Sequence, residues 1–592
     1  MGEFNLPQEE KDKDKNENAG KFNLLDKRWI SVVTDYKGTT DTVGMKEFFE
    51  NAHKYIALAG DTPTQDFAVM RFLLAVLHTV FSRYDADGNV YDGIKLDKRR
   101  KQINEISGRA AKNYPKALMN TWKDLWNKGK FPEIVNEYLK EWSDRFNLFD
   151  DKYPFYQVTE SFFDDCDLVN QKGATDSASS ISFKTVNRKV SETGENYAIF
   201  SMINSPEKGH KGNLEDDQLC RWLITYMAYS ETADKTKFTR YHDIKNIKKY
   251  SGHKGWQYSI GGIHYKADNL FKTLLLNLVL VHPNEKFAGK KQIPAWELSP
   301  EENVRFYLEN NSIDNLARLY TDYSRCVYIP KVENEFGKFF NIVQLPILDK
   351  KDNLLECMTI WECVKKKGDE NKTWHPKENN VNEAMWRNFG LIYLGDKTDN
   401  PDYRAPDIIK WFREISGNIS SSDRIMLSAI GIKSDSSSSN TMTNEMYDDL
   451  NLNLDVSTDI EKDGWVLRIN ELIELTKSFI EKKYVNYLKS AYKLSTGNRD
   501  PKKALINPSL EYLYSVIDKP FKNWLESINF NDDKEDKIAN WKETFKKIVL
   551  DEASRIGKSI GDRGYIGIKD KSKKYINIAL AFNQLVLDIN KF

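Results

Sequence analysis

The sequence has few cysteines, few histidines and no net charge, and each shortage narrows what the chain can be. Its five cysteines, at positions 166, 220, 326, 357 and 363, are odd in number and scattered, which is typical of reduced thiols in a cytoplasmic protein. The 88 basic residues balance 88 acidic ones, so any binding to nucleic acid must come from a local patch. The longest apolar run, 274–281, is interrupted by Asn277, and no segment is predicted to span a membrane.

Catalytic motifs are also scarce. The eight histidines form no HExxH pattern, and the sequence has no P-loop, no GxSxG and no dinucleotide-binding fingerprint. Cys357 and Cys363 are separated by five residues, unlike the CxxC pairs of zinc ribbons, so we expect structural thiols and neither a metal nor a cofactor. His242-Asp243 is a dipeptide found in metal-dependent phosphohydrolases, which keeps a nuclease or phosphohydrolase as the alternative. The sequence favours a binding protein that is not an enzyme.

The chain is long enough for at least two domains. Residues 1–20 mix charges with Asn and Gly and predict a disordered tail. Residues 21–445 combine helical and strand-like segments and predict a large α+β domain, near whose end SDSSSSNTMT (434–443) is expected to be a linker or exposed loop. Residues 446–592 predict an all-α four-helix bundle, with helices expected at 466–492, 508–528, 533–556 and 571–592.

Several elements of the first domain can be predicted from local patterns. Thr62-Pro63-Thr64-Gln65 is a helix start with a capping box, and the apolar residues that follow it predict a core helix. We also expect a helix over 45–58, a projecting loop over 177–196 and further helices over 214–229 and 269–281. Strands are expected near 326–329, 339–348 and 391–394.

The most informative stretch runs from Lys235 to Gly262. It holds seven Lys or Arg against one acid, in a chain with no overall basic excess. Clustered cations suit a phosphate backbone, and Gly252 and Gly255 let main chain approach a ligand closely. The stretch therefore predicts a nucleic-acid surface, with Lys245, Lys248 and Lys249 on the DNA backbone. An ordinary solvated loop on a stand-alone scaffold protein is the other reading.

The order of the motifs resembles a known family. FNLLDKRWISV, PTQDFAVMRFLLAVLHTVF, YPFYQV, the glycine-containing loop and TLLLNLVL follow one another as in CasA, the large subunit of the type I-E CRISPR surveillance complex Cascade. The resemblance implies a non-catalytic antiviral-defence subunit that recognises the motif flanking the target (PAM) through the minor groove of duplex DNA. It implies further that the chain promotes strand opening and R-loop formation and helps to recruit a helicase-nuclease.

Site residues follow from the resemblance position by position. The glycine loop corresponds to Ser251, Gly252, His253, Lys254, Gly255, Trp256 and Gln257. Relatives can carry a nearly continuous glycine run here, so His253 and Lys254 place polar side chains where backbone contacts DNA elsewhere. A lysine finger corresponds to Lys365, Lys366 or Lys367, and a DNA wedge to Gly431, Lys433, Ser434, Asp435 and Ser436.

The polar loop of residues 177–196 corresponds to the contact with the 5′ handle of the CRISPR RNA. Val186, Asn187 and Arg188 are the matching residues, and Phe183 and Arg188 suit stacking on unpaired bases. The partners that the resemblance implies are the RNA handle, target duplex DNA, the Cascade backbone subunits, the small-subunit dimer and the helicase-nuclease, with no membrane.

Overall fold

The computed structural model describes residues 22–175, 177–187, 212–231, 235–332, 335–347, 354–365, 372–380, 383–395, 401–421, 423–434, 442–497, 501–569 and 575–592. The predicted tail, residues 1–20, lies outside them. The chain forms two compact units that interleave along the sequence. Unit 1 comprises residues 1–379 and 430–447, and unit 2 comprises residues 380–429 and 448–592.

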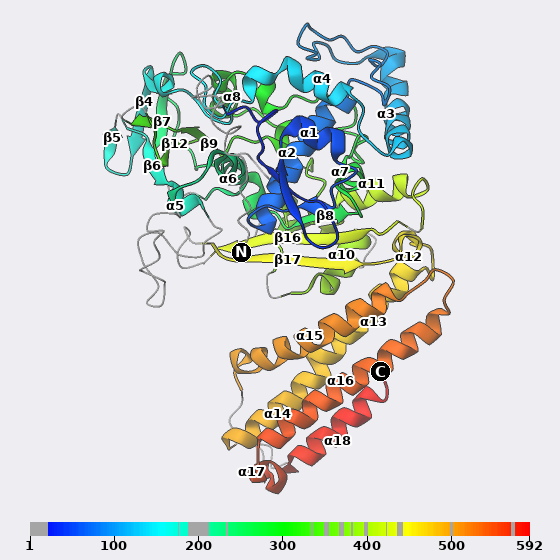
Figure 1. Ribbon diagram of the computed structural model, residues 1–592. Helices are drawn as coiled ribbons and strands as arrows, with labels where there is room; N and C mark the ends of the chain where they lie inside the picture. Colours follow the sequence, from blue (N-terminus) through cyan, green and yellow to red (C-terminus); the bar gives the residue numbers. More distant parts are fainter. Residues whose placement is uncertain are drawn as a thin grey trace, which may run out of the picture. The chain divides into compact units, whose positions relative to one another are not determined.

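Unit 1 contains both helices and sheets, and its longest helix but one, α2 (Pro63–Phe81), forms its core (Figure 1). The Thr62 side chain accepts a hydrogen bond from the Gln65 backbone N–H, which caps α2 as predicted. Among the described residues α2 is the one helix long and apolar enough to cross a membrane, but 94% of that stretch is buried inside the fold, as in a core helix. Around it lie α1 (Met45–Asn51), α3 (Gly108–Lys128), α4 (Ile134–Glu141), α6 (Asp216–Tyr229), α7 (Leu270–Asn277), α8 (Pro300–Leu308) and α9 (Leu316–Tyr320).

The largest sheet of unit 1 has six strands in the order β5-β4-β7-β12-β6, with β9 also pairing with β12. Its strands are β4 (Cys166–Asn170), β5 (Gly173–Thr175), β6 (Ser179–Ser182), β7 (Lys237–Tyr241), β9 (Arg325–Tyr328) and β12 (Phe339–Gln344). β12 runs antiparallel to β6 and β9 and parallel to β7. This sheet carries the start of the basic stretch, because β7 lies near the beginning of residues 235–262.

Smaller sheets complete unit 1. One has the order β2-β1-β3, from β1 (Ile30–Val33), β2 (Thr40–Val43) and β3 (Ala57–Leu58). Another has the order β17-β16-β8, from β8 (Gly262–Lys266), β16 (Met426–Ser434) and β17 (Met442–Asn451), of which residues 430–447 belong to this unit. Two hairpins are β10 (Lys331–Val332) with β11 (Glu335–Phe336), and β13 (Trp361–Lys365) with β14 (Lys372–Pro376).

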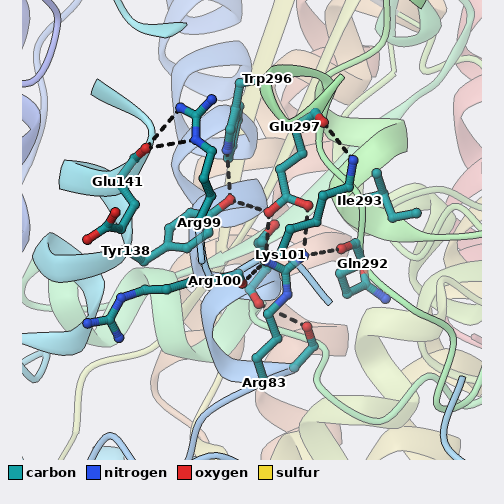
Figure 2. A network of polar contacts seen from close by, with 12 residues as sticks. Arg83, Arg99, Arg100, Lys101, Tyr138, Glu141, Gln292, Ile293, Trp296 and Glu297 are labelled. Carbon is teal, nitrogen blue, oxygen red and sulfur yellow. Dashed lines mark hydrogen bonds and ion pairs between the residues drawn. The ribbon is translucent and has the colours of Figure 1, made fainter. Parts of the chain in front are cut away.

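Two fully buried ion pairs hold the core of unit 1 together. Arg83 at the end of α2 makes two hydrogen bonds to the Glu297 carboxylate, which also accepts from the Tyr138 hydroxyl; Figure 2 shows this network. About three turns earlier, Arg71 makes the same bidentate contact with Glu356 at 2.7 and 2.9 Å. Such pairs fix the register of α2 against distant chain segments, because an unpaired charge there would be costly.

Unit 2 is built mostly of helices. Its long rods are α13 (Trp465–Phe479), continued through a π-helical turn (Ile480–Tyr484) into α14 (Val485–Thr496), then α15 (Lys503–Glu526), α16 (Lys534–Ser559) and α18 (Ile578–Ile589), seen side by side in Figure 1. Trp541, Phe545 and Phe479 pack in its centre. Shorter helices are α10 (Phe389–Tyr393), α11 (Asp407–Ser416), α12 (Leu454–Thr458) and α17 (Asp562–Ile566). The α+β class and the closing helical bundle are confirmed.

Three local predictions were wrong. Residues 391–393 belong to helix α10 and Leu394 caps its end, so the expected strand is absent from this described segment; a short apolar run fits either structure. The helix expected over 45–58 ends at Asn51, and the chain turns into β3. The start of the expected loop 177–196 is ordered as β6 and α5 (Phe183–Val186), since β6 completes the large sheet; residues 188–196 lie outside the described part.

Candidate nucleic-acid interface

The basic stretch 235–262 begins as strand β7 and returns along it as a loop. Two of its cations are used inside the protein. Arg240 forms ion pairs with Asp165 and Asp167 at 2.6 and 2.9 Å, and the Lys237 ammonium donates to the Tyr250 carbonyl at 2.7 Å. These contacts hold the pKa of Asp165 and of Asp167 below the usual range, chiefly through hydrogen bonds from Arg240. Arg240 and Lys237 therefore contact other residues of the protein and stabilise the region around β7.

Lys245, Lys248 and Lys249 remain at the surface of the same loop. All three are exposed, and within the described part of the chain none of them forms an ion pair. The loop that carries them is fixed at both ends. Ile247 N–H donates to the Thr239 carbonyl, and the Tyr250 hydroxyl donates to the Gln344 carbonyl at 2.8 Å. The three ammonium groups thus project from a fixed backbone, as phosphate contacts require.

The two glycines of the loop are needed by the protein's own packing. A Cβ on Gly252 would lie 2.2 Å from the Gln344 side-chain oxygen, and one on Gly255 would lie 2.3 Å from the Ala228 carbonyl oxygen. The Gly255 N–H donates to the Ser230 carbonyl at 3.0 Å, and Gly252 bridges to Pro346. The sequence argument assigned both glycines to close approach by a ligand, but their Cβ positions face the protein interior.

His253 is buried and does not contact solvent. Its imidazole has no exposed surface, and Nε2 lies 2.7 Å from Asp322 Oδ2. The Tyr307 hydroxyl donates to the other oxygen of Asp322. Burial by itself would raise the pKa of Asp322, but the His253 charge and the hydrogen bonds from His253 and Tyr307 hold that pKa below its usual range. The expectation that the His253 side chain touches DNA is therefore corrected.

Lys254, near the middle of the loop, has a side chain that faces outward. Its ammonium is 3.2 Å from Glu231 Oε1 and 4.5 Å from the centre of the Tyr258 ring, and its side chain is 33% exposed. Ser251 is exposed and Gly252 half-buried, so Ser251, Gly252 and Lys254 form the outer edge of the loop.

Trp256 and Gln257 lie on the inner side of the loop, and both are buried. The Trp256 indole N–H donates at 2.6 Å to the Glu356 carboxylate, which also pairs with Arg71. The pKa of Glu356 lies below its usual range, because the raising effect of burial is outweighed by Arg71 and the hydrogen bonds. The loop is thus tied to the core helix α2, and these two residues cannot reach DNA directly.

The residues predicted to contact the RNA handle are only partly visible. Val186 is the last residue of helix α5 and Asn187 follows it; both are buried, at 6% and 7% exposure. Phe183 packs edge-on against Phe340 and is not available for stacking on a base. Arg188 lies outside the described residues. The structure therefore leaves Val186 and Asn187 as backing for a contact rather than as its exposed surface.

The lysine-finger and wedge residues fall at the ends of two hairpins. Lys365 is the last residue of β13, whereas Lys366 and Lys367 lie outside the described part. Gly431, Lys433 and Ser434 belong to the end of β16, with Gly431 buried and Lys433 exposed. Asp435 and Ser436 lie outside the described residues, as does most of the segment 434–443.

The dipeptide His242-Asp243, considered above as a phosphohydrolase motif, contacts charged side chains of the protein. Asp243 forms an ion pair with Arg305, and His242 Nδ1 lies 3.2 Å from Asp165 Oδ2. Among the described residues, no three His, Cys, Asp or Glu side chains are grouped so that they could hold a metal ion. Cys357 is buried with Sγ 3.2 Å from His282 Nε2, and all five cysteines are free thiols.

Four residues that shape the loop could not be found from the sequence. From the sequence alone, charged residues are expected at the surface, and the four are Glu231, Asp322, Arg325 and Glu356. Arg325 is fully buried and donates to the carbonyl oxygens of both His253 and Glu231. The only signal that would reveal them is covariation with the loop.

Comparison with known proteins identifies related chains. The family model for CRISPR-associated protein Cse1 matches residues 23–551. A CRISPR-associated protein CasA/Cse1 of Thermus thermophilus is 30% identical over 141 residues, which cover 24% of this chain and 21% of that relative.

Solved structures share the fold over nearly the whole chain. Thermobifida fusca Cse1 superposes with a TM-score of 0.73 at 20% identity, covering 97% of each chain. A chain of a CRISPR RNA-guided surveillance complex gives a TM-score of 0.62 at 14% identity, covering 96% of this chain and all of that one. At these identities the structural likeness concerns the fold.

Proposed function

Since the chain belongs to the CRISPR-associated protein Cse1 family, we propose that it is the non-catalytic large subunit of a type I-E CRISPR RNA-guided surveillance complex. In that role it recognises the motif flanking the target in duplex DNA, promotes strand opening and R-loop formation, and helps to recruit the helicase-nuclease. The similarity in fold between this chain and a chain of a CRISPR RNA-guided surveillance complex supports this assignment.

The observation that carries the DNA-binding role is the loop 251–257 beside three exposed lysines. Its outer edge offers the backbone of Ser251 and Gly252 and one cation, Lys254. A narrow edge of this kind suits the minor groove, where base pairs differ little and groove width matters. Lys245, Lys248 and Lys249 would hold the neighbouring phosphates, so recognition and non-specific attachment are carried by different residues.

The remaining roles are assigned by position. Lys365, Lys366 or Lys367 would act as the lysine finger. Gly431, Lys433, Ser434, Asp435 and Ser436, of which the first three belong to the end of β16, would act as the wedge. The segment that follows Asn187, including Arg188, would contact the 5′ handle of the CRISPR RNA. The Cascade backbone subunits and the small-subunit dimer would be its protein partners, in the cytoplasm, with no cofactor and no membrane involved.

The test compares guide-loaded complexes with and without this chain. Duplexes matched to the guide but varied at the flanking trinucleotide are bound at two salt concentrations. We expect flank-dependent binding only when the chain is present. Binding that ignores the flank in both complexes would refute the proposal.

Charge-neutralising variants separate the two kinds of contact. Replacing Lys245, Lys248 and Lys249 with Gln should weaken binding to every duplex and reduce the slope of log K against log salt by about 0.9 per lysine that contacts a phosphate. Lys98, Lys112 and Lys116 are exposed lysines elsewhere in unit 1, and their Gln variant is the matched control. An equal change in both variants would contradict the assignment.

The alternative, a metal-dependent nuclease, predicts cleavage that His242→Ala and Asp243→Ala abolish. We expect no metal-dependent cleavage by the wild-type chain, since Asp243 already pairs with Arg305 and His242 already contacts Asp165. Cleavage of duplex DNA with added Mg²⁺ or Mn²⁺, lost in both variants, would establish the nuclease.

A further inference from the structure

A buried polar network lies directly beneath the loop 251–257. Asp322 follows helix α9, and its two oxygens bind residues from separate elements: His253 in the loop, with Nε2 at 2.7 Å, and Tyr307 on α8. The Tyr307 oxygen in turn accepts from the Tyr323 N–H at 3.0 Å. All three side chains are buried, so the His253–Asp322 contact is not weakened by solvent.

The loop backbone around His253 is fixed on both sides. The His253 N–H donates to the Leu345 carbonyl at 2.7 Å, and the Gly255 N–H donates to the Ser230 carbonyl at 3.0 Å. With this backbone fixed, the His253 side chain is fully buried and the Lys254 side chain is 33% exposed.

One further residue joins the two sides of the loop. Arg325 donates to the carbonyl oxygen of His253 and to that of Glu231, whose carboxylate pairs with Lys254. The centre of the Tyr258 ring lies 4.5 Å from the same ammonium. The position of the Lys254 ammonium is thus determined by groups that are themselves buried or held from the interior.

We propose that His253 is a positioning residue: through Asp322 it fixes which side of the loop faces outward, and so presents the Lys254 ammonium and the Ser251–Gly252 backbone to the DNA flanking the target. The inference rests on the proposed function and extends it. A side chain that contacts no DNA sets the discrimination between flanks, because a loop that samples several conformations presents no single edge to the groove.

The test uses the guide-loaded complex with variants of the full chain. His253→Leu fills the space but removes the ring nitrogen, whereas His253→Gln keeps an N–H that can donate to Asp322. We expect His253→Leu to lower the ratio of affinities for preferred and altered flanks by about tenfold or more, and His253→Gln to restore most of it. Affinity for duplex with an altered flank, which depends on Lys245, Lys248 and Lys249, should change by less than about twofold.

Coupling to Lys254 gives a readout that general destabilisation would not move. If His253 acts by orienting Lys254, then Lys254→Gln should lose discrimination in the wild-type background but little more in His253→Leu. Additive losses would overturn the proposal, and so would a His253→Leu complex with unchanged discrimination. Should His253→Leu fail to fold, Tyr307→Phe removes one support of Asp322 and should lower discrimination in the same direction.

Hydrogen exchange of the free chain separates this inference from the proposed function. His253→Leu should speed amide exchange in the peptide covering 251–257, and His253→Gln should slow it again, without change in the helices of unit 2. Unchanged exchange would overturn the positioning role. A wild-type chain that confers no flank dependence would instead refute the DNA-recognition role, while exchange would still decide whether His253 holds the loop.

Discussion

Replacing Arg71 with methionine should make the stability of the chain depend on pH near neutrality. Arg71 and Glu356 are both fully buried, and their two hydrogen bonds measure 2.7 and 2.9 Å. Removing one partner of a buried pair costs about 3–5 kcal/mol. Glu356 keeps its donors Trp256 at 2.6 Å and Met358 N–H at 2.9 Å, so we expect a loss near 3 kcal/mol at pH 7.

The sign of the pH dependence follows from the cause of the pKa shift. In the wild type Arg71 outweighs burial and keeps the pKa of Glu356 low, so this group gives constant stability above about pH 4 and loses it only in more acid solution. Without Arg71, burial raises the folded-state pKa. The variant should then be less destabilised at pH 5 than at pH 8, by about 1.4 kcal/mol for each unit by which the raised pKa exceeds 5.

Calorimetry at pH 5, 6, 7 and 8 is the suitable assay, because it resolves the two units if they unfold separately. The quantity of interest is the difference between variant and wild type at each pH, which cancels the other titrating groups. Arg71→Met with Glu356→Gln is the control, since a neutral amide should abolish the pH dependence. A loss below about 1 kcal/mol that is equal at pH 5 and pH 8 would refute the reasoning.

Three further predictions concern other sites. Gly255→Ala should lower the thermal midpoint more than Gly252→Ala, because the new Cβ meets the Ala228 backbone in the first case and the Gln344 side chain in the second; equal midpoints would contradict this. Asp243→Asn should leave the urea midpoint of unfolding nearly unchanged, because its pair with Arg305 is exposed, and a clear shift of that midpoint would contradict this. Trp541→Ala should cost about 3–5 kcal/mol in the unfolding transition of unit 2, measured by calorimetry, since the indole is fully buried.

The parts of the fold that were predicted correctly are those decided by local sequence. Helix α2 begins where Thr62 and Pro63 place it, although the Gln65 carboxamide accepts from Asp61 N–H rather than from the Thr62 N–H of an ideal capping box. The helices of unit 2 follow from long periodic segments between short connections. The strand predicted at 391–394 was wrong, because four apolar residues in a row show no periodicity that distinguishes a helix from a strand.

The candidate interface was predictable as a segment but not as a surface. Composition identifies the stretch 235–262, yet whether each side chain faces in or out depends on partners far away in the sequence. His253 is buried because Asp322 lies 69 residues further on, and Trp256 because Glu356 lies 100 residues further on. A histidine beside lysines looks like a DNA contact until the tertiary structure supplies a buried acceptor for it.

The interleaving of the two units has a practical consequence for how the chain can be divided. A fragment that stops at residue 379 lacks residues 430–447, and strand β8 would then expose an edge that β16 normally covers. During synthesis, likewise, unit 1 cannot be completed until residues 380–429 of unit 2 have left the ribosome. Expression of either unit by a single truncation should therefore yield aggregation-prone protein, whereas joining residue 379 to residue 430 through a short linker, ending at 447, should give a self-contained first unit.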